Sequence, residues 1–215
     1  TIKNNKMKKI ITLIALVVTV TVSAQSQYEK GMEKAFELWT ANKTTEASQL
    51  FERISKAEKD NWLPSYYAAI IEISGSFGIK EEAVLKAKLN KAQGFLDTAK
   101  SLSPNNPEIL TGQAFLNVGY MAFDGQKYGM TMSMKNNALY AKALKLAPNN
   151  PRVIMSKAEA DMGAARFFGQ PITPFCKDVK RAVELAKKEK ITEKFYPKFM
   201  FDRAAQILKQ CKEKK

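Results

Sequence analysis

The stretch Tyr140-Ala-Lys-Ala-Leu-Lys-Leu-Ala-Pro-Asn-Asn-Pro151 ends in a hexad that occurs 44 residues earlier as Leu102-Ser-Pro-Asn-Asn-Pro107. Working outward from it, one pattern of four positions recurs three times along the chain. The three sets are Ala47, Phe51, Ile54 and Asn61; Ala92, Leu96, Ala99 and Asn106; and Asn136, Tyr140, Ala143 and Asn150. A period of 44 to 45 residues is typical of stacked helical units that share one core.

The hexads read as the end of one helix and the start of the next. The first proline stops the outgoing helix, and the second Asn can accept an N–H from the first turn of the following helix. The last proline then occupies a helical position where a missing N–H costs nothing. We therefore predict that Asn61, Asn106 and Asn150 are N-caps of three helices.

Apolar residues recur at helical spacing, as in Leu85, Leu89, Ala92 and Leu96, and no segment alternates with the period of a strand. A small residue also lies eight positions after each predicted cap, at Ala69, Ala114 and Ala158. Small side chains at fixed positions let neighbouring helices approach closely. The pattern predicts an all-α protein of about nine helices.

The order of small, bulky, small and Pro at Ala92, Leu96, Ala99 and Pro104 resembles the tetratricopeptide repeat, and the stretch 140–151 is its most specific match. The resemblance covers most of residues 28–190 and implies a right-handed array of helical hairpins, an α-solenoid. The family repeats every ~34 residues, whereas the last three units here carry about ten more between their two helices. We therefore expect an exported bacterial type with lengthened repeats, in which Asn136 stands where the family has Ala.

The N-terminal region has the order of a secretory signal. Lys8 and Lys9 precede an uncharged, mostly apolar run over 10–22, and small residues lead to a predicted cleavage after Ala24. Residues 1–6 read as an upstream extension. The run is shorter than the ~17 to 25 residues of a membrane-spanning helix, so an uncleaved anchor is the less favoured alternative. We expect an exported protein, periplasmic or secreted, with 25–215 as a single helical domain that does not span a membrane after processing.

Composition narrows the partners and the chemistry. Cleavage would lower the formal charge from +14 to +10, because four lysines and no acid precede residue 25. Lysines dominate the basic residues, which is typical of a solvated surface, so no nucleic acid is expected, although an anionic envelope polymer remains a possible partner. The chain has no histidine, which excludes His-dependent catalysis and His-ligated metal or haem.

The two cysteines, Cys176 and Cys211, predict a disulfide in an oxidising compartment. Cys176 lies at the expected start of a helix that runs to about Lys188, and Cys211 lies near the end of the helix after Pro197. A turn at 189–193 between these two antiparallel helices would bring the cysteines side by side.

One motif goes beyond what the fold requires. Phe-Gly pairs recur at Phe77-Gly78 and Phe168-Gly169, with Phe123-Asp-Gly125 between them at matched offsets. Such turns would fall on one edge of a regular array. We predict a binding rim along this edge, and the alternative is that each ring caps its local core. The proposed rim residues are Phe77, Phe123, Lys127, Tyr128, Arg166 and Phe168.

Two further groups of residues bear on metal binding and catalysis. Met130, Met132 and Met134 could hold Cu(I) if they converged, or pack as ordinary core residues if the run is helical. Carboxylates such as Glu52, Glu72, Glu108 and Glu159 read as isolated on helical faces, and no nucleophile or phosphate-loop motif accompanies them. No resident metal, cofactor or catalytic residue is therefore expected.

The function expected from the sequence is a non-catalytic scaffold of the bacterial envelope that presents a concave helical face to a protein or peptide, as the tetratricopeptide resemblance implies. The alternative is a periplasmic protein that binds a small ligand or a soft metal near residues 119–134. An enzyme is the third and least favoured reading.

Overall fold

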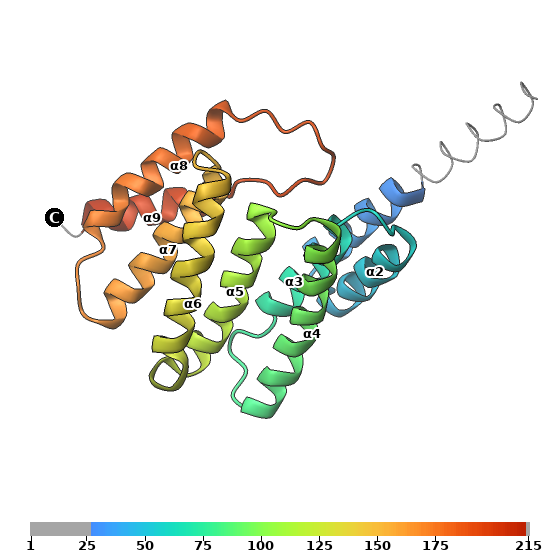
Figure 1. The fold of residues 1–215 in the computed structure, drawn as a ribbon, viewed down its shortest axis with the longest axis horizontal. Coiled ribbons are helices and arrows are strands. Elements are labelled where there is room, and N and C mark those ends of the chain that lie inside the picture. Colours follow the sequence, from blue (N-terminus) through green and yellow to red (C-terminus); the bar gives the residue numbers. More distant parts are fainter. Residues whose placement is uncertain (1–26, 214–215) are drawn as a thin grey trace, which may run out of the picture.

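The computed structural model describes residues 27–213, and over this part of the chain the fold is all-α, with nine α-helices, one short 3₁₀ helix and no strand. Consecutive helices pack side by side in an array that runs from the N-terminal helices to α8 and α9 (Figure 1). The expected signal peptide and its cleavage site lie outside the described residues. Among the described helices none is long and apolar enough to cross a membrane.

The first described helix covers residues 27–40. The later elements are α2 (Thr44–Ala57), α3 (Leu63–Ser74), α4 (Glu82–Leu102), α5 (Pro107–Phe123), α6 (Gly125–Leu146), α7 (Pro151–Phe167), η1 (Thr173–Phe175), α8 (Cys176–Lys188) and α9 (Phe201–Glu213). The extra residues of the later units partly lengthen the second helix of a pair, since α4 and α6 have 21 and 22 residues whereas α2 has 14. They also form the turns at 75–81 and 168–172.

The repeated positions are buried as predicted. In each of the three sets of repeated positions, the three members other than the final Asn are at most 9% exposed. The small residues Ala69, Ala114 and Ala158 are equally buried. Asn136 is buried too, at 2% exposed. Its amide donates to the Ala114 carbonyl at 3.1 Å and accepts from Asn117 at 2.7 Å. Asn136 therefore replaces the expected Ala without leaving a buried polar group unsatisfied.

Two of the three predicted caps are confirmed. The Asn106 side chain accepts from the Glu108 N–H at 2.9 Å, and Asn150 accepts from the N–H groups of Arg152 and Val153. The prediction for Asn61 is wrong by one residue. Its oxygen does accept from the Leu63 N–H at 3.0 Å, but α3 begins at Leu63, so that Trp62 occupies the cap position.

The disulfide between Cys176 and Cys211 is confirmed, with the two Cα atoms 6.1 Å apart. Cys176 is the first residue of α8, as predicted, and Cys211 lies in the last turn of α9. Both sulfurs belong to a second core formed by α7, η1, α8 and α9. The bond therefore links α9, the last described helix, to the start of α8.

Candidate functional site

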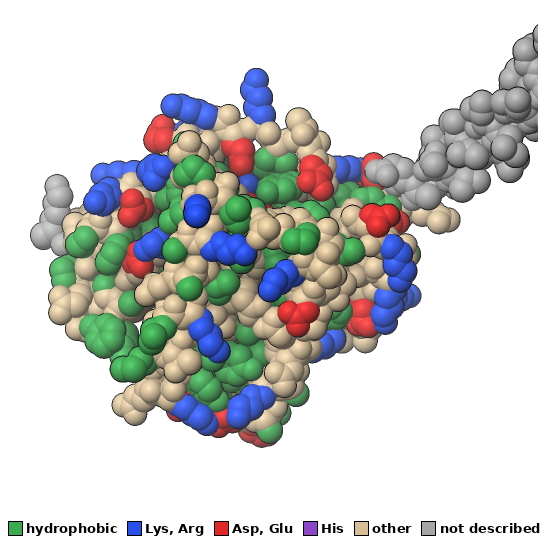
Figure 2. All heavy atoms as spheres, viewed as in Figure 1, with side chains coloured by type: hydrophobic (Ala, Val, Ile, Leu, Met, Phe, Trp, Pro, Cys, Tyr) green, Lys and Arg blue, Asp and Glu red, His purple; other side chains and the backbone are tan. Residues whose placement is uncertain are grey.

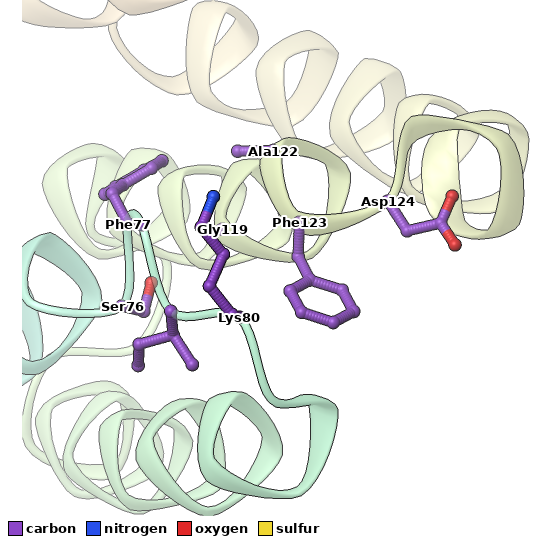
Figure 3. A pocket seen from close by; sticks show the side chains of 9 residues that line it. Ser76, Phe77, Lys80, Gly119, Ala122, Phe123 and Asp124 are labelled. Carbon is purple, nitrogen blue, oxygen red and sulfur yellow. The ribbon is translucent and has the colours of Figure 1, made fainter.

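A cleft of about 310 Å³ opens where the α3–α4 turn meets the C-terminal end of α5 (Figure 3). Its lining comes from residues 76–80 on the turn and from Gly119, Ala122, Phe123 and Asp124 on the other side. It thus contains two of the predicted rim positions, Phe77 and Phe123. The volume is at the lower end of the range for small-molecule pockets, ~300 to 1,000 Å³.

Glycines make the cleft possible. Gly78 has φ of +86°, a conformation that residues with a side chain rarely adopt, and it turns the chain directly after Phe77. A Cβ on Gly119 would lie 3.0 Å from Ser76 Oγ and 3.2 Å from Leu89, so only glycine lets α5 approach the turn this closely. The Phe77 ring packs on Phe115 at 5.5 Å between centroids and remains 42% exposed.

The next unit continues this edge. A Cβ on Gly125 would come within 3.0 Å of the Phe167 ring, so the α5–α6 junction lies directly against the end of α7. Phe167 and Phe168 form an edge-to-face pair at 5.1 Å and are 61% and 70% exposed. Figure 2 shows hydrophobic side chains gathered along this lower edge of the molecule, with basic ones beside them.

The structure therefore places Phe77 and Phe123 at one cleft and Phe168 at the following junction. Phe123 is partly buried and packs against the first core, as the core-cap alternative expected, whereas Phe77 and Phe168 are exposed. We refer to Phe77, Phe123, Phe167 and Phe168 as the phenylalanine edge. Phe167 was missed by the sequence analysis, although it directly precedes a recurring Phe-Gly pair.

The predicted polar residues of the rim are engaged with neighbouring helices. Lys127 and Tyr128 bind Glu82 on α4, at 2.7 Å and 2.6 Å. Lys127, Lys86 and Tyr128 together lower the pKa of Glu82 to about 2. Arg166 donates to Gln210 on α9 at 2.8 Å. These contacts engage the three polar rim residues with α4 and α9.

A basic residue that the sequence analysis passed over lies in the cleft itself. Lys80 lines it, and Figure 3 shows its side chain between those of Phe77 and Phe123. Lys80 is exposed, and within the described residues no carboxylate lies close enough to form an ion pair with it. The positions three residues after Phe123 and Phe168 are Gln126 and Pro171, so the repeat gave no signal for Lys80. The cleft thus combines aromatic surface with one lysine that has no ion-pair partner. Its lining also includes the carboxylate of Asp124, which caps α6 and points away from Lys80 in Figure 3.

The interpretation of Glu108 as isolated is wrong. Glu108 is 1% exposed and accepts from Arg152 Nε at 2.8 Å and from the Asn150 amide at 2.7 Å. Arg152 also forms a bidentate pair with Glu189, at 2.6 Å and 2.8 Å. Burial alone would lower the pKa of Arg152, but the hydrogen bonds to Glu189 and the charge of Glu108 raise it above its ordinary value. This network links the start of α5 to the start of α7 and to Glu189, and it stabilises the packing of these helices.

Glu72 is also a buried, paired carboxylate. It accepts from Ser48 at 2.6 Å, Lys91 at 2.7 Å and Lys88 at 2.9 Å. Burial would raise its pKa, but the hydrogen bonds from Lys91, Ser48 and Lys88 outweigh burial and lower it. Glu159 pairs with Arg203 at 2.7 Å. Among the described residues these carboxylates hold helices together, and they do not converge on a cavity.

The segment 189–200 crosses from α8 back to the start of the array and covers part of the face expected to be open (Figure 1). Tyr67 donates to the Phe195 carbonyl at 2.6 Å, and the Phe195 ring stacks on Phe36 at 5.9 Å. Lys194 pairs with Glu29 and Glu33, at 2.6 Å and 2.9 Å. The segment therefore lies over the N-terminal helices and the start of α3.

The methionine run is helical. Within α6, Met130 and Met134 are 81% and 68% exposed, whereas Met132 is partly buried. Residues two apart on a helix face different directions. Met130 and Met134, four residues apart, share one exposed face, but Met132 lies on another, so the three thioethers do not converge. Met121 accepts a hydrogen bond from Ser133 at 3.4 Å.

No family model and no curated protein matches the chain. One solved structure that is similar to it is the HusA haemophore from Porphyromonas gingivalis, at 23% identity and a TM-score of 0.74, covering 87% of this chain and 94% of that one. A likeness at this identity shows a shared fold. The tetratricopeptide resemblance is not confirmed as a family assignment, although the helical array that it implied is present.

Proposed function

We propose that this protein is a non-catalytic, exported binding protein whose cleft takes up a flat, apolar ligand with acidic groups, and that haem or a related tetrapyrrole is that ligand. The observation that carries the proposal is the cleft at the matched Phe-Gly turns, with Phe77 and Phe123 around a free Lys80. The fold shared with a protein named as a haemophore adds support. The ligand class also fits the alternative expected from sequence, a small ligand near 119–134.

The chemistry of the cleft matches such a ligand in two ways. Aromatic rings bury the faces or edges of a conjugated macrocycle, each at ~1 kcal/mol beyond simple burial. A lysine ammonium can pair with a propionate carboxylate, at ~0.2 to 1 kcal/mol in an exposed setting. The lining includes none of the usual haem ligands His, Cys, Met or Tyr. We therefore expect binding through the ring and its carboxylates, with metal-free porphyrin bound nearly as well as haem.

The test is a titration of haemin into protein 25–215, followed by Soret absorbance and tryptophan quenching. Phe77→Ala should weaken binding roughly fivefold. Phe201→Ala is the matched control, because Phe201 is similarly exposed at 46% and begins α9, away from the cleft. Equal effects of the two variants, or no saturable Soret change, would contradict the proposal.

A second comparison isolates the charge. Lys80→Ala should weaken the binding of haem about twofold to fivefold. It should leave the binding of the dimethyl ester of haem unchanged, because that ester carries no carboxylates. If both ligands weaken equally, Lys80 acts through the shape of the cleft and the proposed carboxylate contact is wrong.

The second candidate function is the scaffold role expected from sequence, with a protein or peptide bound at the phenylalanine edge. The exposure of Phe167 and Phe168, at 61% and 70%, favours it, since these rings offer apolar surface beyond the cleft. A pull-down from envelope extract with the wild type and with Phe168→Ala tests it. A partner retained equally by both proteins would argue against this edge.

Export after Ala24 is part of the same proposal. The disulfide between Cys176 and Cys211 supports it, because such bonds persist in oxidising compartments. N-terminal sequencing of the secreted or periplasmic protein should begin at Gln25. An intact N-terminus in the exported fraction would instead favour the uncleaved anchor.

A further inference from the structure

The charge of the chain is distributed unevenly along the array. Residues 27–123 carry 11 Lys and Arg against 12 Asp and Glu, whereas residues 124–215 carry 20 against 9. The division falls at the boundary between α5 and α6. The N-terminal half is thus near neutral and the C-terminal half strongly basic, an asymmetry that suggests an anionic partner for the second half.

The outer face of α6 gives this asymmetry a location. The helix has four lysines and no acidic residue. Lys127 pairs with Glu82, but Lys135, Lys142 and Lys145 are exposed and have no carboxylate partner within the described residues. Offsets of seven and three place these three on one face, opposite the buried positions of the helix. Figure 2 shows basic side chains distributed over this part of the surface.

α8 extends the basic face. Lys177, Lys180, Arg181 and Lys188 are exposed along one side of the helix. One exposed acidic residue, Glu184, lies on the same side and pairs with Lys187 at 3.1 Å. Arg181 donates to the Pro148 carbonyl at 3.1 Å and to Asn149 at 3.0 Å, so α8 meets the chain just beyond Lys145. The exposed lysines of α6 thus lead to those of α8 at the end of α6, and we name the exposed basic residues of these two helices the basic face.

We propose that the basic face docks the protein on a membrane surface rich in anionic lipid headgroups. Specific protein interfaces are enriched in Arg and depleted in Lys, whereas the basic residues of this face are all Lys except Arg181. Lysine is a strongly hydrated point charge that suits a diffuse layer of phosphates better than a fixed, bidentate contact. Such docking holds the exported protein at an envelope surface whatever the cleft binds.

The experiment is co-sedimentation of protein 25–215 with vesicles of phosphatidylcholine alone and of phosphatidylcholine mixed with phosphatidylglycerol. The test variant is Lys135→Glu/Lys142→Glu/Lys145→Glu. The matched control is Lys30→Glu/Lys59→Glu/Lys100→Glu, which changes the net charge equally with exposed lysines of the near-neutral half. Circular dichroism checks that both fold, and a Lys→Gln version of the test variant gives an intermediate charge.

Wild type and control should bind the anionic vesicles and not the neutral ones, and added salt should release them. The test variant should bind at least about tenfold more weakly, with the Gln version between the two. If the control loses as much as the test variant, only net charge matters and the basic face is not the docking surface. Failure of the wild type to bind anionic vesicles, including a case where it binds an acidic protein instead, also overturns the proposal.

Discussion

Replacement of Arg152 by Met should be one of the most destabilising single changes in this protein. The guanidinium is 9% exposed, binds Glu108 through Nε and Glu189 through both terminal nitrogens, and stacks on the Tyr196 ring at 5.1 Å. Without it, Glu108 keeps only the Asn150 amide at 2.7 Å and the Tyr196 hydroxyl at 3.4 Å. A carboxylate that is 1% exposed would then lack a counter-charge.

The magnitude follows from that geometry. Removing one partner of a buried ion pair costs ~3 to 5 kcal/mol. Glu108 lies in the first turn of α5, where the helix dipole recovers ~1 kcal/mol. We therefore expect the free energy of unfolding to fall by about 3 kcal/mol, which is roughly 6 to 12 °C in melting temperature for a domain of this size.

Urea unfolding of wild type, Arg152→Met, Glu108→Gln and the double variant gives the four free energies of unfolding of a double-mutant cycle. The double variant should be more stable than Arg152→Met, because it no longer buries an unpaired charge. Glu189→Gln serves as a control, since Glu189 is 24% exposed and its loss should cost ~1 kcal/mol or less. A loss below ~1 kcal/mol for Arg152→Met, or additive effects in the cycle, would refute the reasoning.

Changing Cys211 to Ser should lower the free energy of unfolding by about 4 kcal/mol, since the bond to Cys176 closes a 35-residue loop; chemical denaturation with and without reductant measures this, and the variant should be insensitive to reductant. The Glu82 carboxylate, with its pKa lowered to about 2, should stay charged as the pH falls to 3. In the Lys127→Met variant, the midpoint of the Glu82 carboxyl titration, followed by NMR, should rise towards ~4.3. An unmoved midpoint would contradict the pairing of Lys127 with Glu82. Asn106→Ala should cost ~1 kcal/mol by thermal melting, because it removes the cap of α5, and an unchanged melting curve would show that the cap is dispensable.

Much of the fold could be predicted because the repeat is marked by helix caps and helix stops, which depend on residues close together in the sequence. Asn106 and Asn150 act as caps through bonds to residues two or three positions on, so their role needs no knowledge of distant parts. At Asn61 the signal was weaker, because the helix stop before it lacks a proline, and the boundary was displaced by one residue. The disulfide could be predicted because only one pairing of two cysteines exists.

The candidate site was only partly predictable. The Phe-Gly turns located its edge, but which ring would be exposed depends on how neighbouring units pack. Phe77 lies on Phe115 and stays half exposed, whereas Phe123 lines the cleft but is partly buried against the first core. Lys127 and Tyr128 were expected at the rim, and they are bound to Glu82 because α6 lies one unit along from α4.

That last contact reveals a rule that the sequence already contained. Lys127 and Glu82 are 45 residues apart, Glu108 and Arg152 are 44 apart, and so are Glu159 and Arg203. Each pair is separated by one repeat period. In a regular stack, a position in one unit faces the equivalent position in the next, so complementary charges one period apart are expected partners.

The same rule shows where the repeat ceases to be informative. Arg203 obeys it from α9, so the register persists to the last described helix. The segment 189–200 does not obey it, because Lys194 reaches Glu29 across 165 residues and Phe195 reaches Tyr67 across 128. Periodicity specifies contacts between neighbouring units only. A chain that folds back over several units makes contacts for which a one-dimensional repeat carries no signal, and this is why the cover over the N-terminal helices could not have been predicted.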